Sequence, residues 1–170
     1  MDEAGTLETL AQVSVTLSGF SGVVVAFRSG ASSTLDTWLP RERLIFWLLL
    51  VSSLSALFFS LLPLVLAAFR LAPLVVWRST SLALAGFLAA SVSAAWRSNR
   101  RLSATGHPSV IPHVWAVGGP LMVVVATLQL ANALGAFRGR AFGVYLLGPL
   151  LLLGMACLMF VAFLIYPSRR

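Results

Sequence analysis

Residues 44–69 read LIFWLLLVSSLSALFFSLLPLVLAAF and contain no charged side chain. A helix rises about 1.5 Å per residue, so this stretch is long enough to cross a hydrocarbon core of about 30 Å. Inside that core only helices and closed barrels satisfy the backbone polar groups, and this segment has helical length. The stretch therefore predicts a transmembrane helix and an all-α fold.

The composition of the whole chain agrees with a membrane protein. Hydrophobic residues make up 59% of the 170 residues and charged residues only 10%. The mean hydropathy is +0.94. These values lie outside the range of soluble globular domains, so we expect a single integral-membrane domain over residues 1–170.

Four further apolar segments flank this helix, separated by arginine-containing loops and by Pro73, which cannot continue a helix arriving from residues 44–69. Tryptophan and tyrosine lie near most segment ends, as expected at a membrane–water interface. The sequence thus predicts a polytopic bundle of five transmembrane helices, at residues 7–27, 44–69, 79–96, 114–137 and 141–166.

The first segment, LETLAQVSVTLSGFSGVVVAF at residues 7–27, differs from the others because it has a patterned polar face. At 100° per residue one sector of this helix contains Glu8, Gln12, Thr16, Gly19 and Gly22. This face suits close packing against other helices, or the lining of a pore or cavity. A third interpretation is an amphipathic helix on the membrane surface, which leaves four spans.

The fourth segment contains two carboxamides, Gln129 and Asn132, three residues apart and thus on adjoining positions of one helix face. Carboxamides are costly when they face lipid, so we expect both to face the bundle interior. There they either form interhelical hydrogen bonds or contribute to a permeation or ligand site.

All twelve basic residues are arginine, and they lie between the apolar segments, which favours a role in membrane topology over nucleic-acid binding. With five spans and the N-terminus outside, eight arginines lie on the cytoplasmic side and four outside. The four-span alternative gives the same count for the later loops. One group, Arg97, Arg100 and Arg101, is either a topogenic flank or a contact for anionic lipid headgroups.

Residues that could act in catalysis or bind a metal ion are scarce. Of the five acidic residues only Glu8 lies within an apolar segment, and His107 and His113 have no further ligand nearby, so we expect no catalytic, cofactor or metal site. The one cysteine, Cys157, is expected to be a buried structural thiol. The sequence therefore predicts that the protein is not an enzyme.

Residues 8–27, ETLAQVSVTLSGFSGVVVAF, resemble the opening of small uncharacterised bacterial multi-pass membrane proteins, in which a similar Ser/Thr/Gly-dotted helix precedes several plain spans. The resemblance implies a multi-pass protein of the bacterial inner membrane. It implies no activity. The arginine distribution predicts an N-terminus outside and a cytoplasmic C-terminus if there are five spans. Two functions remain: a structural or interaction partner of a membrane complex, or an oligomeric channel lined by the first helix. The expected partners are the lipid bilayer and either a second copy or another membrane protein.

Overall fold

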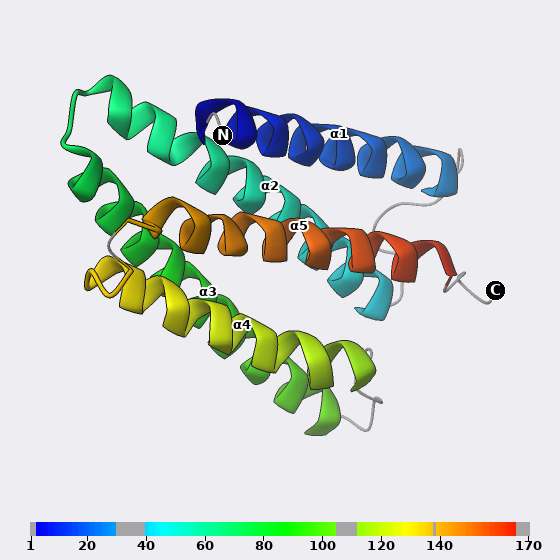
Figure 1. The fold of residues 1–170 in the computed structure, drawn as a ribbon. Helices are drawn as coiled ribbons and strands as arrows, with labels where there is room; N and C mark the ends of the chain where they lie inside the picture. Colours follow the sequence, from blue (N-terminus) through cyan, green and yellow to red (C-terminus); the bar gives the residue numbers. More distant parts are fainter. Residues whose placement is uncertain (1–2, 30–39, 105–111, 138, 166–170) are drawn as a thin grey trace. The chain divides into compact units, whose positions relative to one another are not determined.

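The computed structural model describes residues 3–29, 40–104, 112–137 and 139–165, with side chains at 3–23, 44–98, 100, 117–137 and 139–164. These residues form five α-helices and no strand (Figure 1). The helices are α1 (Glu3–Ser29), α2 (Pro40–Ala68), α3 (Pro73–Ala104), α4 (Pro112–Ala133) and α5 (Ala141–Ile165).

Three of these helices have the length and hydropathy needed to cross a membrane: Leu44–Ala68 in α2, Pro73–Ser98 in α3 and Ala141–Leu164 in α5. These three indicate a membrane protein. Within the described residues, the apolar part of α4, Val117–Ala133, is shorter, and α1 does not meet the combined requirement of length and hydropathy.

Most helix ends differ from the predicted segments, by eight residues at the end of α3, and two of the differences have a local explanation. Pro73 was expected to separate two helices, and it does. It is also the first residue of α3, six residues before the predicted segment, because the missing N–H of a proline costs nothing in the first turn of a helix. Helix α4 ends at Ala133, four residues before the predicted limit, because Gly135 has a φ of 88°. Gly135 N–H donates to the Asn132 carbonyl and Ala136 N–H to the Ala131 carbonyl, both at 3.0 Å, which is a Schellman motif.

The chain divides into two compact units. Met1–Leu62 with Pro149–Arg170 forms the first, and Pro63–Gly148 forms the second. In the first unit α1, most of α2 and most of α5 pack together. The Ser18 hydroxyl donates to the Ser53 hydroxyl at 2.8 Å, and the rings of Phe20 and Phe160 have their centroids 5.6 Å apart. One polar and one aromatic contact thus tie α1 to its two neighbours.

The second unit is built on α3 and α4, which lie side by side, with the start of α5 (Figure 1). Its buried apolar side chains include Leu84, Leu88 and Val125. The same interior also holds several polar side chains, and these make up the candidate site.

Candidate functional site

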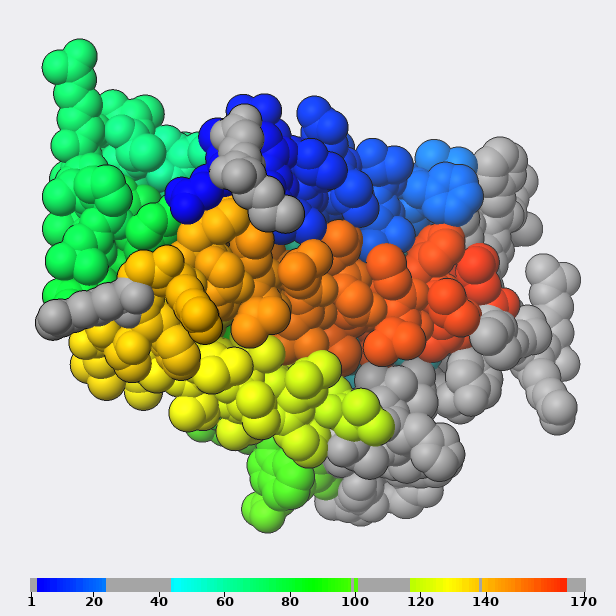
Figure 2. Space-filling view, viewed as in Figure 1, coloured from blue at the N-terminus to red at the C-terminus, as the bar shows by residue number. Residues whose placement is uncertain are grey.

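The predicted polar face of α1 lies on the protein surface. The five residues of this face are all exposed: Glu8, Gln12, Thr16, Gly19 and Gly22. A Cβ placed on either glycine would meet no heavy atom within 4 Å. In the space-filling view α1 (blue) forms part of the visible surface (Figure 2). The small and polar side of α1 is therefore not the side that packs within the chain.

The buried side of α1 instead contains Leu7, Ala11, Ser14 and Ser21. The serine hydroxyls do not need a partner on another helix. Ser14 donates to the Leu10 carbonyl at 2.8 Å and Ser21 to the Leu17 carbonyl at 2.6 Å. A serine that bonds back to its own helix behaves as a small residue, and it lets a neighbouring helix approach closely.

Gln129 is fully buried in the second unit, where its Nε2 donates to two carbonyls of α5. The distances are 2.8 Å to the Val144 oxygen and 3.2 Å to the Tyr145 oxygen. Along α5, Pro149 has no N–H to give to the Tyr145 carbonyl four residues earlier. Gln129 therefore supplies a donor where the proline has removed one.

Asn132 lies one turn further along α4 and is 3% exposed. Its Nδ2 donates to the Ser81 hydroxyl of α3 and to the Ala141 carbonyl at the start of α5, both at 2.9 Å. Gln129 and Asn132 were predicted to face the interior, and both side chains lie there. Together they join α4 to α3 and α5 by hydrogen bonds.

An aromatic group lies next to this network. Tyr145 is fully buried and has a side-chain hydrogen bond with Thr80. Its ring centroid lies 5.6 Å from that of Trp77, and Phe142 lies 5.4 Å from the same Trp77 ring. The tyrosine thus has an apolar body packed among rings and a polar end held by a threonine, as buried tyrosines usually do.

Arg78 reaches the end of α4. A Cβ placed on Gly135 would lie 2.5 Å from the Nη2 of Arg78, so the guanidinium rests against the turn that ends α4. A cation near the C-terminal carbonyls of a helix is favoured by the helix dipole. The sequence alone does not predict that Arg78 lies against a helix terminus.

The chemistry available to this cluster is hydrogen bonding. The Gln129 Oε1, the Asn132 Oδ1 and the Arg78 Nε are buried and have no partner among the described residues. Among all the residues that the structure describes, no group of three or more histidine, cysteine, aspartate or glutamate side chains is placed to hold a metal ion. The cluster can hold helices together and accept hydrogen bonds.

None of the remaining predicted residues with a described side chain belongs to this cluster. Arg97 and Arg100 are exposed on α3, whereas the side chain of Arg101, the whole of His107 and the side chain of His113 fall outside the described residues. Cys157 was expected to be buried but is exposed on α5. Hydrophobic periodicity could not predict which side of α5 is buried, because α5 is apolar on every side.

Comparison of the chain with protein-family models, with curated proteins and with solved structures found no match.

Proposed function

We propose that this chain is a multi-pass protein of a bacterial inner membrane, with all five helices spanning. The N-terminus lies outside and the C-terminus is cytoplasmic. Three membrane-length helices and the eight-to-four distribution of the arginines support this arrangement. The acidic residues Asp2 and Glu3 then stay outside.

Within the membrane, the chain serves as a structural or interaction partner, and it binds either a second copy or another membrane protein through α1. The observation that carries this proposal is the exposure of Glu8 and Gln12, one turn apart on α1. Polar side chains are costly in contact with lipid, so a spanning helix with such a face favours a protein neighbour. The buried carboxamides of Gln129 and Asn132 already donate hydrogen bonds inside the chain. The polar surface that remains for a partner is therefore on α1.

We expect the double variant Glu8→Ala/Gln12→Ala to dissociate the native complex extracted in a mild detergent. The double variant removes the interhelical hydrogen bonds that this face can make with a partner, and such bonds contribute to association together with close packing. Native mass spectrometry measures the result as a fall to the mass of the single chain, and the mass of the intact complex tells a second copy from another protein. Val13→Ala is the matched control because Val13 is 45% exposed on another side of α1. A wild-type chain that is always single, or a complex that survives the double variant, contradicts the proposal.

A second candidate is an oligomeric channel or facilitator lined by the same face, with Gln129 and Asn132 as further candidates. Glu8, Gln12 and Thr16 follow one another at one-turn spacing on the exposed side of α1, as a pore-lining row would. The hydrogen bonds of the two buried carboxamides favour a packing role for them.

The channel predicts ion flux in proteoliposomes. Glu8→Gln removes the one charge of the row, so we expect conductance to fall and cation preference to weaken, while Glu3→Gln, further towards the N-terminus, leaves both unchanged. Vesicles that stay tight to every tested ion would exclude the ion-conducting form and leave the interaction role.

A further inference from the structure

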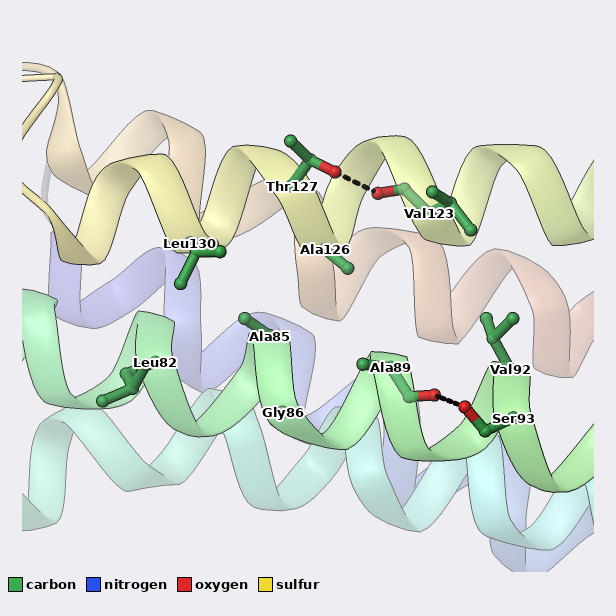
Figure 3. Close-up of a pocket in the computed structure, with 10 residues that line it drawn as sticks. All are labelled: Leu82, Ala85, Gly86, Ala89, Val92, Ser93, Val123, Ala126, Thr127 and Leu130. Atoms are coloured by element: carbon green, nitrogen blue, oxygen red, sulfur yellow. Dashed lines mark hydrogen bonds between the residues drawn. The ribbon is translucent and has the colours of Figure 1, made fainter.

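A groove runs along the outside of the second unit between α3 and α4 (Figure 3). Its volume is about 520 Å³, within the range of small-molecule sites. Ala126 and Leu130 of α4 point towards α3, and Ala85 points back (Figure 3). Most lining residues are apolar, and many of them, such as Leu82 and Val123, are exposed.

The two hydroxyls that line this groove already donate hydrogen bonds within their own helices. Ser93 donates to the Ala89 carbonyl at 2.8 Å and Thr127 to the Val123 carbonyl at 2.9 Å, each within its own helix (Figure 3). No charged side chain is among the residues that line the groove. Its surface therefore matches a hydrocarbon chain.

The α3 side of the groove has the length of one membrane leaflet. From Leu82 to Ser93 the helix rises about 16 Å, close to half of the hydrocarbon thickness of about 30 Å. Trp77 and Trp96 lie about 28 Å apart along α3 by the same rise, which marks the two interfaces. The groove thus begins within one turn of the interface at Trp96 and runs through the middle of the membrane.

Beyond that interface the same helix face carries a positive charge. Arg100 follows Ser93 by two turns, so it lies on the groove side of α3. Its guanidinium carbon lies 5.1 Å from the centre of the Trp96 ring, a cation–π arrangement. An apolar groove of leaflet length with an arginine at its polar end matches the two parts of an anionic lipid.

We propose that the α3–α4 groove binds an anionic phospholipid, with one acyl chain in the groove and the phosphate on Arg100. The small side chains of the groove would also suit a helix of a second copy. The charge at one end favours the lipid, because a neutral helix gains nothing from Arg100 at headgroup depth.

The test measures lipid retained by the full chain in native mass spectrometry, after extraction from vesicles of equal phosphatidylglycerol and phosphatidylcholine. Gly86→Leu fills the groove, and a Cβ at Gly86 meets no heavy atom within 4 Å, so the helix has room for it. Ala94→Leu is the matched control, since Ala94 is exposed about 140° around α3 from Ala89. Arg100→Gln removes the charge, and Arg70→Gln is its control beyond the other end of α3.

We expect Gly86→Leu to lose most bound phosphatidylglycerol and Ala94→Leu to keep it. Arg100→Gln should weaken phosphatidylglycerol retention about fivefold, the effect of one basic residue at an anionic surface, and leave phosphatidylcholine unchanged. Equal retention by Gly86→Leu and Ala94→Leu would overturn the proposal. So would equal loss of both lipids in Arg100→Gln, or a Gly86→Leu chain that changes from dimer to monomer while its bound lipid stays the same, because a second copy would then occupy the groove.

Discussion

Gly148→Val is expected to lower the free energy of unfolding by about 1–3 kcal/mol, the usual cost of overpacking. Gly148 is buried in α5. A Cβ at this position would collide with the Cδ2 of Leu84 and lie 3.0 Å from its Cγ. Leu84 is fully buried, so its side chain has little room to turn away. Valine adds two methyl groups beyond that Cβ, so α3 and α5 must move apart.

Gly154→Val is the matched control on the same helix. Gly154 is exposed, and a Cβ there meets nothing within 4 Å, so the variant should be neutral or slightly stabilising through the higher helix propensity of valine. Denaturation in mixed detergent and SDS measures both variants. Leu84→Ala should reduce the cost of Gly148→Val, with a coupling of roughly 1 kcal/mol between the two sites. Equal costs at residues 148 and 154 would mean that the contact with Leu84 does not limit the packing.

The sequence predicts the apolar helices well because their signal is local. Residues 44–69 have no charge and coincide closely with α2, and Pro73 marks the break before α3. The early end of α4 depends on which of two glycines, Gly135 or Gly139, ends the helix. The arginines on either side of Gly139 favour that glycine when the sequence is taken alone. Both glycines have positive φ, but the Schellman motif forms at Gly135.

The packing side of α1 could not be predicted from residue polarity. Sorting residues by polarity groups Glu8 and Gln12 on one face, but it does not decide whether that face packs against other helices, lines a pore or lies on the membrane surface. The structure buries Ser14 and Ser21 instead, because their hydroxyls bond to their own helix and their small size permits close approach. The surface left exposed is the one with long polar side chains, which is why a partner is proposed there.

Local sequence patterns could not predict the hydrogen-bond partners of Gln129 either. The sequence indicates that a carboxamide so deep in an apolar helix faces inward, but the acceptors depend on how α4 turns back into α5. One signal was present. Pro149 implies that the Tyr145 carbonyl lacks its helical donor, and this carbonyl is one of the two that Gln129 contacts.

Gln129→Leu is expected to cost about 1 kcal/mol of unfolding free energy, within the range measured for hydrogen bonds between membrane helices. Leucine has a similar volume, so no cavity forms. The variant loses the donor, but it also removes the buried Oε1, which has no partner among the described residues. The Val144 carbonyl keeps its helical partner in α5, whereas the Tyr145 carbonyl loses its donor inside the protein. Thr127→Val is the control on α4, because Thr127 is exposed and bonds only to its own helix, and we expect it to be nearly neutral.

Measuring Gln129→Leu in a Pro149→Ala chain tests whether the glutamine acts through the Tyr145 carbonyl. In Pro149→Ala the new N–H of residue 149 can donate to the Tyr145 carbonyl within α5, so this carbonyl no longer depends on Gln129. Gln129→Leu should then cost roughly 1 kcal/mol less than it does in the presence of Pro149. Both costs come from the same denaturation measurement in mixed detergent and SDS. An unchanged cost would show that Gln129 acts through Val144 or through packing alone. A reduced cost would show that a glutamine of α4 compensates for a proline in α5, which explains why a carboxamide and not a leucine is buried at residue 129.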